Sequence, residues 1–212
     1  MLFCSQKFLL FFAIIFVLYW ALPGRRPRVW LLLAASFYFY ACWSKQLALI
    51  ICASTLLDYL LALGMEHTTG TWRRRLLLSV SLVANLGLLC YFKYANFFLD
   101  SLTQALHAAG STAGFGALNI ILPIGISFYT FEAINYTIDV YRRRIQAERN
   151  LGDFMLFILF FPHLVAGPIV RARDFLPQIK RVKQWDWARL FLGTGYVVMG
   201  VVKKMAIADR MA

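Results

Sequence analysis

The sequence predicts an all-α protein, a polytopic bundle of membrane helices in which one hydrophobic segment is broken or re-entrant. Hydrophobic residues make up 61% of the 212 residues and charged residues only 15%, and the mean hydropathy is +0.65. So little polar surface cannot cover a soluble globule of this size. The apolar residues also gather into runs near the length of a membrane helix, with basic clusters between them.

The net charge of +12 is not evidence of nucleic-acid binding. The basic residues flank the apolar runs, where the positive-inside rule places them on the cytoplasmic side of a membrane. We therefore expect contact with membrane lipid and no nucleic-acid partner.

The four cysteines predict neither a metal site nor a disulfide framework. Cys4, Cys42, Cys52 and Cys90 are scattered, without CxxC spacing or a companion histidine. We interpret them as buried thiols that act as small apolar residues.

The first apolar run extends from Phe8 to Leu22 and ends at Pro23-Gly24. It has no clear small-x-small cleavage site of a signal peptide, so we interpret it as the first membrane helix. The basic cluster Arg25, Arg26 and Arg28 follows it. This cluster predicts a cytoplasmic turn and an N-terminus outside.

The second and third runs, Val29–Trp43 and Leu47–Met65, predict a helical hairpin that returns to the cytoplasm. A run of about 20 residues crosses about 30 Å of hydrocarbon at about 1.5 Å per residue. The basic triplet 73–75 follows on the predicted inner side. Asp58 lies inside the third run and serves either a site or a structural role, as a cap or in a pairing with a neighbouring helix.

Leu76–Phe92 is predicted as a fourth helix that runs outward. The aromatic residues of segment 93–98 favour a position at the membrane interface. Asp100–Asn119, rich in glycine and hydroxyl residues towards its end, is the most loop-like part of the chain, and we expect His107 there to be solvated.

The fifth helix begins near Pro123 and Gly125 and continues to Tyr141. Glu132, Tyr136 and Asp139 follow one another at spacings of four and three, so they share one helix face. We predict that this face, with Asn135 beside it, points into the bundle.

Two acids on this face have alternative interpretations. Asp139 either forms an ion pair with Arg142 or Arg143 or takes a chemical role. Glu132 lies deeper, with no adjacent cation in the sequence, and is expected to be hydrogen-bonded or protonated and to line a cavity.

The regular pattern fails at Phe154–Val170. Pro162, Gly167 and Pro168 interrupt helix hydrogen bonding within this run. A crossing here would place the basic residues that follow on the outer side, against the charge rule. These residues are Arg171, Arg173, Lys180, Arg181 and Lys183.

The next run, Leu190–Val202, spans only about 20 Å as a helix, too short for an unaided crossing. A re-entrant segment resolves both problems, because irregular backbone is tolerated at membrane depth where protein or a water-filled cavity surrounds it. We therefore predict that Phe160–Arg171 dips into the membrane and returns to the cytoplasmic side.

Several blocks of the sequence resemble one known family. They are LPIGISFYTFEAINYTIDVYR, FFPHLVAGPIVRARDFLPQ and VKKMAIAD, together with YFKYANFF and SFYFYACW. Their order and spacing closely resemble the membrane-bound O-acyltransferase family, and within it the bacterial branch that acetylates polysaccharides. The resemblance covers essentially the whole chain.

The resemblance implies acyl transfer through a thin centre of a many-helix bundle in the bacterial inner membrane. The acceptor is a hydroxyl of an exported polysaccharide, with alginate favoured, and acetyl-CoA is the expected acyl donor and co-substrate. No bound cofactor or metal is implied. Other subunits of an export and acetylation machinery are expected partners, and D-alanyl or other acyl transfer to a cell-wall polymer is the alternative within the family.

The family's essential histidine lies in a tryptophan-histidine motif downstream of a lysine pair, which Lys203-Lys204 matches here. The sequence stops at Ala212, so no residue of this chain inherits the catalytic assignment. We expect residues 1–212 to form a single membrane-embedded domain, truncated at the C-terminus and inactive alone.

Three other residues are candidates for the substrate path. His163 is either a general base or a histidine that holds a loop by hydrogen bonds. Arg171 and Arg173 either bind an acidic donor or polysaccharide, or contact solvent and lipid phosphate.

Two further classes of function stay open. Broken helices and intramembrane acids also occur in secondary transporters, although no inverted repeat is visible in the sequence. A noncatalytic membrane scaffold would bind soluble acetylation subunits without consuming an acyl donor.

Overall fold

The computed structural model describes residues 6–110, 116, 118, 120, 123, 125–164, 167, 169–208 and 210, and these residues form helices and connections without a strand. The all-α prediction is confirmed. The elements are α1 (Gln6–Ala21), α2 (Arg25–Ala41), α3 (Lys45–His67), α4 (Thr71–Leu89), η1 (Cys90–Tyr94), α5 (Ala95–Ala108), α6 (Ile126–Tyr141), α7 (Leu151–Leu159), α8 (Phe161–Leu164), α9 (Ala172–Lys180), α10 (Trp187–Val202) and η2 (Lys203–Ala208).

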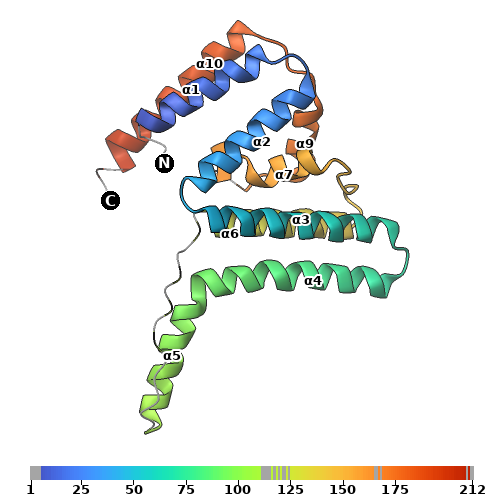
Figure 1. The fold of residues 1–212 in the computed structure, drawn as a ribbon, viewed down its shortest axis with the longest axis vertical. Coiled ribbons are helices and arrows are strands. Elements are labelled where there is room, and N and C mark those ends of the chain that lie inside the picture. Colours follow the sequence, from blue (N-terminus) through green and yellow to red (C-terminus); the bar gives the residue numbers. More distant parts are fainter. Residues whose placement is uncertain are drawn as a thin grey trace.

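The core of the molecule is the layer formed by α3, α4 and α6, which pack against one another (Figure 1). Helix α7 packs on α2 and α3, and α9 packs on α7. Tyr129 and Tyr136 of α6 and Phe154 and Phe157 of α7 are among the largest side chains that are fully buried. A second, smaller cluster joins α1 and α2 to Phe161 of α8.

Two helices are long and apolar enough to cross a membrane: α3, and the continuous helical stretch Thr71–Ala108. Their outward surfaces carry large exposed apolar side chains such as Leu49 and Leu60 of α3. An apolar surface of this kind fits hydrocarbon better than water. Helix α1 is apolar as well, but its 16 residues extend only roughly 24 Å at 1.5 Å per residue.

The hairpin helices begin and end close to the predicted positions. Helix α2 starts earlier than expected, at Arg25, so part of the basic cluster lies in its first turn, where Pro27 fits because it needs no N–H partner. Helix α3 starts after Ser44, whose hydroxyl accepts a hydrogen bond from the Leu47 N–H at 3.4 Å.

The prediction of a loop over Asp100–Asn119 is wrong for its first part. The helix continues from α4 through the π-helical turn η1, where it bends, and α5 ends only at Ala108 (Figure 1). Polar residues such as Asp100 alternate at helical spacing with exposed Phe97, Phe98 and Leu102, so the segment is an amphipathic helix without a core partner. Exposed His107 belongs to this helix. Residues 111–115, 117 and 119 lie outside the described residues.

Two of the cysteine interpretations also change. Cys42, Cys52 and Cys90 are free thiols, but Cys42 and Cys90 are exposed, so their interpretation as buried residues is wrong. Both directly follow the last residue of a helix, Cys42 after α2 and Cys90 after α4. Cys4 lies outside the described residues.

The broken segment is present. Helix α7 ends at Leu159, Phe160 leaves the helical conformation with ψ 107°, and the single-turn helix α8 begins at Phe161. Pro162 therefore stands in the first turn of α8, where a missing N–H does no harm. The direction of this segment relative to a bilayer stays a prediction.

Gly167 is required where the chain leaves α8. Its N–H donates to the His163 carbonyl at 2.9 Å, and a Cβ at this position would stand 2.6 Å from the His163 Cβ. Only glycine permits so close an approach of backbone and side chain. Pro168, which was also predicted as a breaker, lies outside the described residues.

One buried arginine ties the central layer together at one end. The Arg74 side chain of α4 donates to the Met65 carbonyl at 2.5 Å and to the Tyr141 and Val140 carbonyls at 2.7 and 3.3 Å. These carbonyls belong to the last turns of α3 and α6, which have no partner within their own helices. A guanidinium there also offsets the negative ends of two helix dipoles.

Replacing Arg74 with glutamine is expected to destabilise the bundle. Hydrogen bonds to a charged group contribute about 1.5–3 kcal/mol each, so the loss should be at least about 2 kcal/mol. Thermal unfolding of the detergent-solubilised protein, followed by circular dichroism, measures the change. Arg75→Gln is the matched control, because Arg75 is exposed on the same helix. Equal midpoints for the two variants would contradict this role of Arg74.

Candidate functional site

Glu132 and His163 meet inside the protein. Glu132 lies on the buried face of α6, and α8 places His163 opposite it, with the His163 Nε2 atom 3.5 Å from the Glu132 Oε2 atom. The two side chains are 4% and 12% exposed, respectively. The rings of Phe160 and Phe175 lie 5.4 and 5.5 Å from the imidazole and enclose it.

Polar atoms in this part of the protein lack hydrogen-bond partners. Glu132 Oε1, Tyr129 Oη and Thr130 Oγ1 of α6 are buried without one among the described residues, and His163 Nε2 has only the 3.5 Å approach of Glu132 Oε2, which is too poorly aligned for a hydrogen bond. Native proteins satisfy nearly all buried polar groups, so each exception needs a physical reason. A polar ligand that reaches such atoms gains hydrogen bonds that the folded chain alone does not make.

Asp58 is fully engaged by the neighbouring helix. Its Oδ1 atom accepts a hydrogen bond from the Ser81 hydroxyl at 2.6 Å, and both carboxylate oxygens lie 2.9 Å from the Asn85 amide nitrogen. Ser81 also lies 3.3 Å from the Thr137 hydroxyl of α6. Of the interpretations of Asp58, these contacts favour the pairing with a neighbouring helix.

Asp139 pairs with a different arginine from those predicted. Its carboxylate lies 3.5 Å from Arg144, not from Arg142 or Arg143. Helix α6 ends at Tyr141, and Arg143 adopts a left-handed conformation with φ 57°. The chain therefore folds back and brings Arg144 to Asp139, which helical spacing did not anticipate.

The remaining candidate residues differ in how exposed they are to solvent. Asn135 is half-buried on α6, whereas Arg171 and Arg173 are exposed at the start of α9. Arg173 makes a surface pair with Asp174 at 3.6 Å. No described contact joins either arginine to Glu132 or His163.

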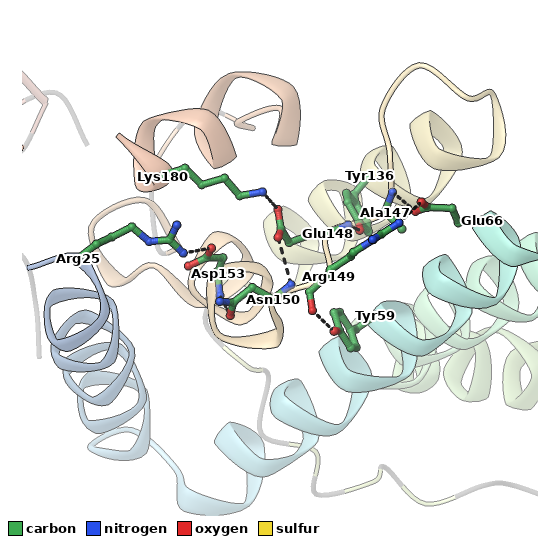
Figure 2. A network of polar contacts seen from close by, with 10 residues as sticks. All are labelled: Arg25, Tyr59, Glu66, Tyr136, Ala147, Glu148, Arg149, Asn150, Asp153 and Lys180. Carbon is green, nitrogen blue, oxygen red and sulfur yellow. Dashed lines mark hydrogen bonds and ion pairs between the residues drawn. The ribbon is translucent and has the colours of Figure 1, made fainter. Parts of the chain in front are cut away.

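A second polar group organises the connection between α6 and α7 (Figure 2). The buried Glu148 carboxylate pairs with Lys180 of α9 at 2.6 Å and accepts from the Asn150 N–H at 3.1 Å. The Glu148 N–H donates to the Tyr136 hydroxyl at 2.9 Å. One residue of the loop thus contacts α6, α9 and the start of α7.

Further contacts tie this loop to α2 and α3. Glu66 of α3 accepts from the Ala147 N–H at 2.7 Å, and the Tyr59 hydroxyl donates to the Arg149 carbonyl at 2.6 Å. At the start of α7, Asp153 pairs with Arg25 of α2 at 2.5 Å. Figure 2 shows these side chains converging on the loop from separate helices.

Burial and the Arg25 guanidinium have opposite effects on the pKa of the Asp153 carboxyl. Helix α7 has nine residues, too few to cross a bilayer, and the Asp153 side chain is 1% exposed in its first turn. Burial raises the pKa of this carboxyl above its usual range, and the Arg25 guanidinium opposes that rise.

The two polar regions differ in what they can do. The loop contacts pair donors with acceptors across five helices, with Asp153 Oδ1 left unpaired among the described residues, as expected of a structural lock. Sequence analysis missed them because their partners are distant in the chain. The Glu132–His163 pair keeps unpartnered atoms in an apolar setting, so it is the better candidate for chemistry or substrate contact. The described residues contain no group of three His, Cys, Asp or Glu side chains that could hold a metal ion.

Fold and site together define a class: an all-α membrane protein with a broken helix that brings an imidazole to a buried carboxyl. Comparison with known proteins narrows this class. The chain is 42% identical over 216 residues to the probable alginate O-acetylase AlgI of Pseudomonas aeruginosa, covering all of this chain and 41% of that protein. It is 40% identical to the protein of the same name from Azotobacter vinelandii, again over the whole chain and 42% of the relative.

A relative with a different named substrate also matches. The peptidoglycan O-acetyltransferase of Helicobacter pylori is 32% identical over 212 residues, covering 88% of this chain and 39% of that protein. No family model and no solved structure matches the chain. The predicted resemblance is confirmed: along its whole length the chain is homologous to this group of O-acyltransferases, and it spans about two fifths of their length.

The Glu148–Lys180 pair can be tested as a structural lock. Glu148→Gln should lower the free energy of unfolding by about 1–3 kcal/mol, because a buried charged partner of Lys180 and Asn150 is lost. Lys180→Gln should also destabilise the protein, since it leaves a buried carboxylate underpaired. The double variant should lose less than the sum of the two.

Thermal unfolding of the solubilised protein provides the measurement. Asp174→Asn in the exposed Arg173–Asp174 pair is the control, with an expected change within about 0.5 kcal/mol. Strictly additive losses in the double variant would show that Glu148 and Lys180 do not stabilise the protein through each other.

Proposed function

We propose that the chain is part of a membrane O-acyltransferase that transfers acetyl groups to hydroxyls of an exported polysaccharide. The observation that carries this proposal is 40–42% identity, over the whole chain, to proteins named alginate O-acetylase. The relative named for peptidoglycan shares the named acetyl transfer but not the named polymer. Alginate is the favoured acceptor because identity to the proteins named for it is higher.

The proposed topology places the N-terminus outside the bacterial inner membrane and the basic clusters inside. Its support is geometric: Arg74 joins the start of α4 to the ends of α3 and α6. Arg25, at the start of α2, joins the same region through Asp153. The clusters 25–28, 73–75 and 142–144 thus gather towards one side, which the positive-inside rule makes cytoplasmic.

Acetyl-CoA is the proposed co-substrate, and other subunits of an export and acetylation machinery are proposed partners. An anionic donor would approach from the basic side. Exposed Arg171 and Arg173 fit such an approach, because a guanidinium binds phosphate oxygens in a bidentate manner.

Glu132 and His163 are proposed to line the path of the acyl group or of the acceptor hydroxyl. His163 Nε2 of α8 faces Glu132 Oε2 of α6 at 3.5 Å, and the other carboxylate oxygen, Glu132 Oε1, is buried without a partner among the described residues. A hydroxyl that enters there finds an acceptor and an imidazole within one small apolar enclosure, where hydrogen bonds are strong. His163 is placed as a residue that positions substrate.

An acetylation assay tests the proposed function. Membranes that carry the complete protein, with its partner subunits, are expected to transfer label from acetyl-CoA to alginate oligosaccharides. Membranes without the protein serve as the control. Labelled acetyl-CoA consumption that does not depend on the added polysaccharide would contradict polysaccharide acetylation, as would uptake of acceptor into vesicles without covalent change.

Glutamine substitutions test the proposed path. Glu132→Gln and His163→Gln in the complete protein should each lower the acetylation rate at least tenfold, a loss typical of a misplaced reacting group. The thermal midpoint is measured alongside, so that loss of folding is not mistaken for loss of contact. His107→Gln, the same change on exposed α5, should leave the rate unchanged. A near-normal acetylation rate in His163→Gln would contradict the proposed role in the substrate path and leave the Glu132–His163 pair with a structural role only.

A further inference from the structure

A groove of about 470 Å³ lies between α1, α2, α8 and α9, beside the proposed acyl path, because Phe160 and Phe175 line the groove and also enclose the His163 imidazole. Its size is within the range of ligand sites in proteins. The floor is apolar and largely aromatic. It includes Phe16, Leu32, Leu156, Phe161, Phe175 and Ile179.

The rim of the groove is basic. Arg25, Arg28, Arg181 and Lys183 line it, and none of its described lining residues is an aspartate or glutamate. The fold already uses two of these cations, since Arg25 pairs with Asp153 and Arg28 donates to the Leu22 and Lys183 carbonyls at 3.0 and 3.1 Å.

The other two cations are available. Arg181 and Lys183 are exposed, and neither takes part in an ion pair among the described residues. They lie two residues apart in the link between α9 and α10, beyond the apolar floor. An anion at this rim would therefore meet positive charge that has no internal partner.

The aromatic side chains beside this rim are of the kind that concentrates at the level of lipid headgroups. The Trp20 and Trp185 rings meet edge to face with centroids 4.9 Å apart, and the Arg28 guanidinium lies 5.0 Å above the Tyr19 ring. Tryptophan and tyrosine concentrate at the membrane interface, where one end of the ring is apolar and the other is wet. Basic residues at this depth contact lipid phosphate.

We propose that this groove binds an acidic phospholipid, with its phosphate at Arg181 and Lys183 and its acyl chains against the aromatic floor. The basic rim and the apolar floor of the groove together favour an acidic phospholipid over other ligands. A free phosphate would leave the apolar floor uncovered, and a zwitterionic lipid would bring no net charge to the two cations. An apolar groove with a basic rim at headgroup level matches an acidic lipid in both respects.

Native mass spectrometry of the detergent-solubilised protein tests the proposal. Dioleoylphosphatidylglycerol should bind at least tenfold more tightly than dioleoylphosphatidylcholine. Arg181→Gln/Lys183→Gln should reduce binding of the acidic lipid to that of the zwitterionic one. The control Arg73→Gln/Arg75→Gln removes the same charge from exposed residues of α4 and should leave the preference intact.

Three results would overturn the proposal. Equal affinity for the two lipids would remove the charge selection, and an equal loss in the α4 control would show a general effect of surface charge. Equally strong competition by inorganic phosphate or by chainless glycerophosphoglycerol would identify an anion site that makes no use of the apolar floor. The thermal midpoints of both double variants confirm that they are folded.

Discussion

The structure depends on hydrogen bonds that other parts of the chain make to the backbone carbonyls at the ends of its helices. Carbonyls at the last turns of α3 and α6 are buried among the helices, so they need partners from the chain itself. Arg74 supplies them from α4 and thereby fixes three helices at one end of the layer. Glu66, the neighbour of Met65 in α3, connects this end of the layer to the α6–α7 loop, because its carboxylate accepts a hydrogen bond from the Ala147 N–H. The position of α7, and with it the start of the broken segment, follows from this corner.

That corner also explains why the candidate site lies where it does. Helix α7 is anchored at its first turn by Asp153 and by the loop around Glu148, so its length determines where the chain breaks. The break at Phe160 turns α8 and presents His163 to Glu132. The polar contacts around Glu148 and Asp153 lie at one end of α7, and the Glu132–His163 pair lies beyond the other end, so the contacts proposed to stabilise the fold are separate from those proposed for chemistry.

Hydrophobic periodicity and length predicted α1 to α4 and α6 within a few residues, and the clustered Pro162 and Gly167 predicted the break. These features depend on local sequence. Helix α5 was missed because its polar residues resemble a loop unless their helical spacing is considered. The Asp139–Arg144 pair and the contacts of Glu148 depend on turns and on segments far away in the chain, so single-sequence patterns do not contain them. The spacing of Glu132 and His163 in the sequence likewise does not predict whether these buried residues contact a substrate.

The π-helical turn at Cys90–Tyr94 has a consequence for what the protein shows to its surroundings. One extra residue in a turn rotates everything after it by about 100° around the helix axis. The helix bends at this turn, so α5 leaves the packed layer, and its Phe97 and Phe98 side chains are exposed (Figure 1). The π-helical turn thus lets one continuous helical stretch pack within the layer along α4 and present the apolar side chains of α5 to the surroundings.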